Sequence, residues 1–144
     1  MLSKFLISPY FVFGLFLIIF FGHALGLDLE WYWAVEKLDT LHHFLGGIWI
    51  SAVFFYFLNQ RPNIFDIKKN FLVTLVFALG FSVLASVIWE FFEFALDQIF
   101  DGRLSMPPTQ PGLEDTIYDL FFGLIGALLF GIVYLVGLKP KLKS

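Results

Sequence analysis

The sequence predicts an all-α, polytopic membrane protein with four transmembrane helices in a compact bundle. Its 144 residues are 59% hydrophobic and have a mean hydropathy of +0.83, which is too apolar for an ordinary soluble domain. Long stretches lack Lys, Arg, Asp and Glu, and each approaches the ~20 residues that a helix needs to cross a bilayer. We expect a single integral membrane domain over residues 1–144, with helices at about 5–27, 39–58, 71–97 and 116–138 and an outer loop at 98–115.

The first predicted helix, Phe5–Leu27, contains no Lys, Arg, Asp or Glu and is interrupted only by His23. Its apolar run exceeds the roughly 7–15 residues of a signal-peptide core, so a retained helix is favoured, although Ala24-Leu25-Gly26 resembles a cleavage site. Residues 28–38 follow and contain Trp31, Tyr32 and Trp33. Because such rings prefer the headgroup level, we expect an interfacial segment there.

Asp39-Thr40 can cap the second predicted helix, although that helix could begin a turn earlier. Arg61-Pro62-Asn63 marks the turn that leads to the third helix. The 98–115 connection contains three prolines within 107–111, which exclude a regular helix there. The fourth helix has a face of small residues for close packing, and glycines elsewhere could receive it. The small face is Gly123, Gly126, Ala127 and Gly131, and the receiving glycines are Gly46, Gly47 and Gly80.

The basic residues fall mainly on one side of the predicted membrane domain. The other side has only Lys37 and Arg103 among the nine Lys and Arg of the chain. The positive-inside rule therefore predicts cytoplasmic termini and a cytoplasmic 59–70 loop in a multi-pass protein of the cell membrane. The active face would then be extracytoplasmic. The residues on the cytoplasmic side are Lys4, Arg61, Lys68, Lys69, Lys139, Lys141 and Lys143.

Ionisable residues gather at the opposite, outer end of the predicted helices. Asp39, Glu90 and Asp119 each lie ~19 residues, or ~28 Å of helix rise, from the cytoplasmic end of their helix. His43 follows Asp39 by one turn, and Glu93 shares a helix face with Glu90. Charged groups near membrane depth are costly, so their convergence from three helices indicates a functional site. Asp97 extends the stripe of Glu90 and Glu93, and Asp115 lies one turn before Asp119.

A divalent metal ion is the simplest way to neutralise so many acids. Carboxylate and imidazole are ligands for Zn, Mn or Fe, and helix bundles supply such ligands from facing helices. The chain has no cysteine, which excludes thiolate sites and cysteine nucleophiles. Whether His42 and His23 join the site stays open. The predicted metal ligands are Asp39, His43, Glu90, Glu93, Asp115 and Asp119.

A structural role is the alternative for part of this set. Asp39, Asp115 and Asp119 lie near predicted helix N-termini, where acids interact favourably with the helix dipole. Glu90 and Glu93 lie toward a helix C-terminus, where the dipole disfavours them. The two glutamates are therefore the predicted catalytic residues, acting as base.

Three motifs together resemble the YjdF-like family of uncharacterised membrane proteins and, more distantly, VanZ-like proteins. They are Asp39-x-x-x-His43-Phe44, Glu90-x-x-Glu93-Phe94, and Asp115-Thr116-x-x-Asp119 before Leu124-Ile125-Gly126-Ala127. The resemblance covers about residues 36–131, and Phe94 stands where the family has Trp. It implies a four-helix membrane architecture with a polar outer site, and it supplies no reaction.

Three classes of function fit these observations. The first is a membrane-embedded hydrolase in which a metal ion activates water toward a lipid-linked or envelope substrate. The second is a small proton- or cation-coupled transporter, which would need a partner or a homo-oligomer because no inverted repeat is evident. The third is a non-catalytic accessory subunit. Membrane lipids are the expected partners in every case, and no nucleic acid is expected.

Overall fold

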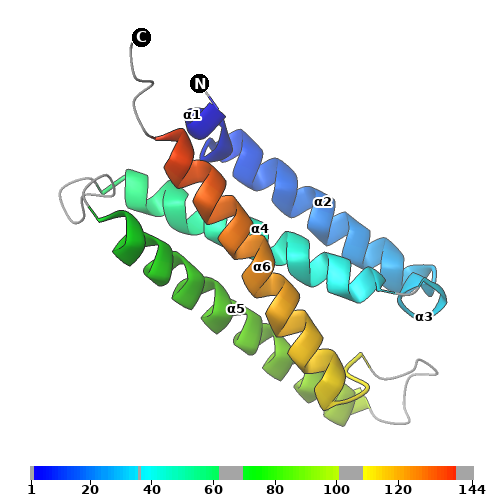
Figure 1. Ribbon diagram of the computed structural model, residues 1–144. Coiled ribbons are helices and arrows are strands. Elements are labelled where there is room, and N and C mark those ends of the chain that lie inside the picture. Colours follow the sequence, from blue (N-terminus) through cyan, green and yellow to red (C-terminus); the bar gives the residue numbers. More distant parts are fainter. Residues whose placement is uncertain (1, 36, 62–69, 101–108, 139–144) are drawn as a thin grey trace.

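The structure is a computed structural model, and it describes all residues except 1, 36, 62–69, 101–108 and 139–144. The described residues are helical apart from short connections (Figure 1). Four helices are long and apolar enough to cross a membrane, which confirms the predicted all-α, four-helix class. The helices are α1 (Leu2–Leu6), α2 (Pro9–Asp28), α3 (Trp31–Ala34), α4 (Leu38–Asn59), α5 (Phe71–Phe100) and α6 (Leu113–Gly137).

The first predicted helix is divided into α1 and α2. Proline cannot donate the hydrogen bond that a helix interior requires, but it suits a first turn. Pro9 accordingly begins α2, and Ser8 precedes it as the N-cap, with Ser8 Oγ accepting a hydrogen bond from the Phe11 amide at 3.2 Å. The predicted interfacial segment, residues 28–38, contains the short helix α3 between α2 and α4.

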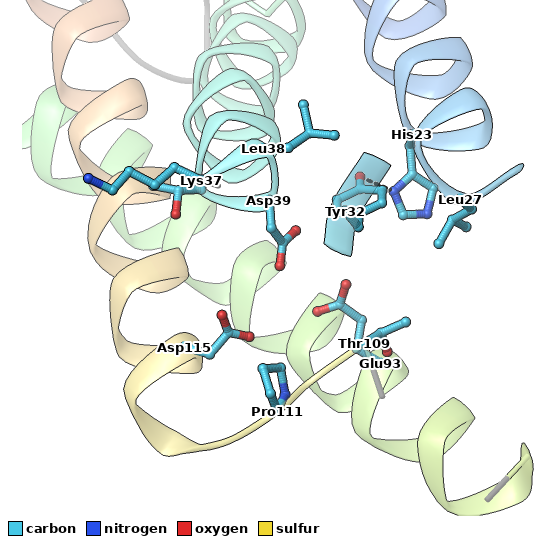
Figure 2. A pocket seen from close by; sticks show the side chains of 11 residues that line it. His23, Leu27, Tyr32, Lys37, Leu38, Asp39, Glu93, Thr109, Pro111 and Asp115 are labelled. Atoms are coloured by element: carbon cyan, nitrogen blue, oxygen red, sulfur yellow. Dashed lines mark hydrogen bonds between the residues drawn. The ribbon is translucent and has the colours of Figure 1, made fainter. Parts of the chain in front are cut away.

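Helix α4 starts earlier than the capping residues suggested. Lys37 occupies the N-cap position with φ 65°, and its side chain makes no capping hydrogen bond. This left-handed residue turns the chain into the helix at Leu38, so Asp39 and Thr40 do not cap α4, and the earlier start that the sequence also allowed is the one observed. Asp39 lies in the first helical turn instead. Its carboxylate is directed toward α5 and α6 (Figure 2).

Helix α6 crosses α4 at very short range (Figure 1). A Cβ atom added to Gly47 would lie 2.7 Å from the carbonyl carbon of Gly123, and one added to Gly126 would lie 3.0 Å from that of Phe44. Two helix backbones can approach this closely only where side chains are missing. Gly46 and Gly80, which the sequence offered as further contact points, would each meet no atom within 4 Å.

The interior of the α4–α5–α6 bundle is apolar toward one end and polar toward the other. The apolar part includes the buried residues Ala52, Phe55, Ala78, Phe130 and Tyr134. At the apolar end of the bundle, the start of α1 lies against the last turn of α6, because a Cβ atom added to Gly137 would lie 3.6 Å from Ser3 Cβ. We call the opposite end, where α4 and α6 begin and α2 and α5 finish, the polar end.

Part of the predicted topology lies outside the described residues. This applies to the turn residues Pro62 and Asn63, to much of the outer loop (101–108), and to six of the basic residues used for orientation. Those basic residues are Lys68, Lys69, Arg103, Lys139, Lys141 and Lys143.

Candidate functional site

His43 lies at the centre of the polar end, with a different group of carboxylates facing each ring nitrogen. Its Nε2 atom is 3.6 Å from Asp39 Oδ1 and 3.9 Å from Asp119 Oδ2. Its Nδ1 atom is 3.7 Å from Glu90 Oε1 on the neighbouring helix α5. Glu93 lies one turn further along α5 and belongs to the same group of potential ligand atoms as His43 and Glu90. We call Asp39, His43, Glu90, Glu93 and Asp119 the His43 cluster.

The carboxylates of this cluster are unusually buried for acids. The exposed fraction is 5% for Glu90, 6% for Glu93 and 1% for Asp119. Glu90 Oε1 and Asp119 Oδ1 have no hydrogen-bond partner among the described residues. An ionised carboxylate buried without a partner is strongly unfavourable. These oxygens therefore require a proton or a cation beside them.

The spacing of the cluster suits a shared ion better than direct hydrogen bonds. Separations of 3.6–3.9 Å between His43 and three carboxylates exceed the ~2.7–3.2 Å of a hydrogen bond. Two ligands that are each ~2.1 Å from one ion lie at most ~4.2 Å apart. Two overlapping sets have all ligand atoms within 4.8 Å of one another, so the most distant atoms would have to move together by up to about 0.6 Å around an ion. The two sets are Asp39–His43–Asp119 and His43–Glu90–Glu93.

The connection between α5 and α6 reaches back onto the cluster through Gln110. Its side-chain amide donates hydrogen bonds to Glu90 Oε2 at 2.9 Å and to Thr116 Oγ1 at 3.0 Å. Sequence reasoning missed Gln110, although it is a polar residue in the proline-rich connection expected above the acids. Glu90 thus has one oxygen fixed by Gln110 and the other directed at His43.

Asp97 has a structural role, unlike the two glutamates that precede it on α5. Its carboxylate accepts hydrogen bonds from the Thr109 amide, the Thr109 hydroxyl and the Gln110 amide, each at 2.9 Å. It therefore fixes the end of the connection against α5. Asp97 is not part of the His43 cluster.

His23 and His42 form a separate group beside the cluster. The Tyr32 hydroxyl lies 2.6 Å from His23 Nδ1, and His42 Nδ1 donates to the Leu38 carbonyl at 3.0 Å. Burial raises the pKa of the Tyr32 phenol, and the nearby carboxylates of Asp39, Glu93 and Asp119 raise it further. Tyr32 thus keeps its hydroxyl proton at neutral pH, and its hydroxyl and His23 Nδ1 form a hydrogen bond whose donor is set by the His23 tautomer. Neither histidine belongs to the two ligand sets.

A cavity of about 330 Å³ opens next to the cluster. Figure 2 shows the carboxylates of Asp39, Glu93 and Asp115 pointing into it from α4, α5 and α6, with Tyr32 and His23 on the far side. Asp115 therefore faces the same space as the cluster but lies outside both ligand sets. The structure brings five of the six predicted ligands together around His43 and places the sixth across the cavity.

Comparison with known proteins gives a family but no function. The chain matches the family described as predicted membrane protein (DUF2238) over residues 2–139. It is also 33% identical over 108 residues to an uncharacterized protein of Thermotoga maritima. The aligned region covers 75% of this chain and 53% of the relative. The chain thus spans about half the length of that relative. No solved structure matches.

The family match agrees with the YjdF-like resemblance of the three motifs, whereas the VanZ-like relationship is not shown. The match extends over almost the entire chain, from α1 to the end of α6. The chain therefore belongs to the DUF2238 family of predicted membrane proteins.

Proposed function

We propose that the His43 cluster binds a divalent metal ion and that this ion serves a membrane-embedded hydrolase. The observation that carries the proposal is that the carboxylates of Glu90 and Asp119 face opposite ring nitrogens of His43. Each carboxylate also has one buried oxygen, Glu90 Oε1 and Asp119 Oδ1, without a hydrogen-bond partner among the described residues. Zn, Mn and Fe all accept this mixture of nitrogen and oxygen ligands.

The ligand set that we favour is His43, Glu90 and Glu93. All three residues are buried, and their ligand atoms lie within 4.8 Å of one another. Gln110 fixes Glu90 by its other oxygen. If His43 binds the ion through Nδ1, its Nε2–H faces Asp39 and Asp119. A carboxylate that accepts a hydrogen bond from the second N–H of a ligating histidine fixes the tautomer of that histidine and raises the basicity of its ligating nitrogen.

The hydrolytic role follows from the position of Glu93 between the cluster and the open cavity. Glu93 belongs to the ligand set and also lines the cavity where a substrate would enter. A bound divalent ion lowers the pKa of a water molecule and polarises a carbonyl or phosphoryl oxygen. The Glu93 carboxylate has an oxygen that no hydrogen bond between described residues engages, and beside that water it can accept a proton. Both oxygens of Glu90 are taken, one by Gln110 and one by the ion. A lipid-linked or envelope molecule is the substrate class that this membrane location favours.

Elemental analysis of detergent-purified protein tests the metal site. We expect stoichiometric Zn, Mn or Fe in the parent protein and its loss in His43→Gln. His42→Gln is the matched control, because His42 is the adjacent histidine and its Nδ1 is engaged by the Leu38 carbonyl. If the parent protein contains no stoichiometric metal after growth and purification with each metal supplied, the metal site is wrong. The accessory-subunit class then remains. Bound metal without hydrolysis of any lipid-linked substrate would favour the ion-binding and transport class.

A further inference from the structure

A second cavity, of about 220 Å³, borders the His43 cluster from the side of the membrane-spanning helices. It is a groove between α2 and α5 with α4 as its floor. We call this cavity the α2–α5 groove, and its lining is mostly apolar. Its apolar and small residues are Phe16, Ile19, Phe20, Gly46, Gly47, Trp49, Ile50, Ala85 and Trp89.

The groove and the polar cavity adjoin each other. His23, Tyr32 and Asp39 line both of them. His43 also lines the groove, so an apolar molecule in the groove lies directly beside the imidazole at the centre of the cluster. A ligand with a polar head and an apolar chain can therefore place each part in matching surroundings at the same time.

The length of the groove corresponds to one leaflet of a bilayer. Asp39 and Ile50 are its limits along α4, and their separation in sequence corresponds to ~16 Å of helix rise. This is about half of the ~30 Å hydrocarbon thickness of a membrane. The residues at its edges are accessible, with exposed fractions of 53% for Phe20 and 39% for Trp89. The groove thus runs from the polar end to mid-membrane depth and is open to lipid along its side.

We propose that the α2–α5 groove holds one acyl or isoprenoid chain of a membrane lipid while the lipid headgroup lies in the carboxylate cavity. This assigns a lipid as the substrate class of the proposed metal site and rests on that function. A partner transmembrane helix fits less well, because it would run ~30 Å across the hydrocarbon core, whereas the groove is lined over only ~16 Å of α4, from Asp39 to Ile50. One flexible lipid chain matches the mostly apolar lining and the single-leaflet length.

Gly46 provides a precise way to fill the groove. A Cβ atom at Gly46 would meet no atom within 4 Å, and the residue lines the groove, so a leucine side chain can start there without a clash and occupy groove volume. Gly14 is the matched control. It is also half-buried with no atom within 4 Å of an added Cβ, but it lies outside the groove lining.

The test uses phosphatidylglycerol that carries a photoactivatable diazirine in the middle of one acyl chain. Full-length protein is labelled in detergent, with and without chelator, and the adducts are mapped by mass spectrometry. We expect adducts to concentrate on Phe16, Phe20, Trp49 and Trp89. Gly46→Leu should reduce them by about tenfold, the loss expected when the burial of about two methylene groups is removed. Gly14→Leu should leave them unchanged.

The outcomes separate this inference from the proposed metal function. Adducts spread evenly over lipid-facing residues such as Phe57 and Phe77, or unaffected by Gly46→Leu, would overturn the groove assignment even if metal is bound. Groove labelling in a protein that contains no metal would support the lipid site and count against the metal site. Should Gly46→Leu fail to fold, Ala85→Leu fills the same groove from α5.

Discussion

His43 Nδ1 lies 3.7 Å from Glu90 Oε1, with one atom on α4 and the other on α5. The separation is too long for a hydrogen bond, and Glu90 Oε1 has no other partner among the described residues. Either an ion lies between the two groups, or the carboxyl group is protonated. The two explanations make opposite predictions for variants that remove an acid.

Glu90→Gln and Glu93→Gln should each lose bound metal. At a metal concentration 100-fold above Kd, the parent protein should gain about 2.7 kcal/mol from binding, and the variants should lack this gain. If the acids repel one another without an ion, removing one should instead stabilise the fold. Thermal melting in detergent, with metal and with chelator, measures whether each variant lowers or raises the stability of the fold.

Glu114→Gln is the control for these variants, because Glu114 is an exposed acid in the first turn of α6. It should retain both metal and chelator sensitivity. Higher melting temperatures for both Glu90→Gln and Glu93→Gln, with no response to chelator, would show that the cluster is not a metal site.

Gln110→Ala should loosen the connection above the cluster. The variant removes the donor to Glu90 Oε2 and Thr116 Oγ1, so Glu90 loses its fixed orientation. Metal affinity should fall by about 10- to 100-fold, as for other residues that orient a ligand. Hydrogen exchange near residues 109–112 should increase. Gln98→Ala removes an exposed amide on α5 and should change neither quantity; an equal effect in both variants would rule out the positioning role of Gln110.

Gly126→Leu should disrupt the packing of α6 on α4. A side chain there meets the backbone of Phe44, which cannot move aside as a flexible side chain can, so we expect a loss of about 3 kcal/mol. Gly80→Leu on α5 meets no atom within 4 Å and should change stability by less than about 0.5 kcal/mol. The measurement is unfolding in mixed micelles, and similar midpoints for the two variants would show that close α4–α6 contact is unimportant.

The predicted orientation places the polar end outside the cell. Because the chain has no cysteine, single cysteines can report the accessible side directly. Glu114→Cys at the polar end should react with a membrane-impermeant maleimide on intact cells. Gln60→Cys, at the exposed opposite end of α4, should react only after permeabilisation. The reverse pattern would place the candidate site in the cytoplasm.

The sequence alone determined the membrane class and the level of the polar residues. Helix length is set by bilayer thickness, and a charge-free stretch is readable without any tertiary information. The same regular rise puts Asp39, Glu90 and Asp119 at similar depth. Local signals were less decisive at helix ends, where Pro9 divided the first helix and where Lys37, not Asp39, occupies the N-cap position of α4.

The tertiary structure decided which of these polar residues meet. Helical spacing gives the face of each helix but not its rotation against its neighbours, which depends on packing. Contact between the Gly47 and Gly123 backbones sets the approach of α4 and α6 and so turns His43 toward Asp119. The same packing leaves Asp97 to fix the connection, brings Gln110 onto Glu90, and opens the groove beside Gly46. Each is a contact between separate segments, so none could be read from spacing within a single helix.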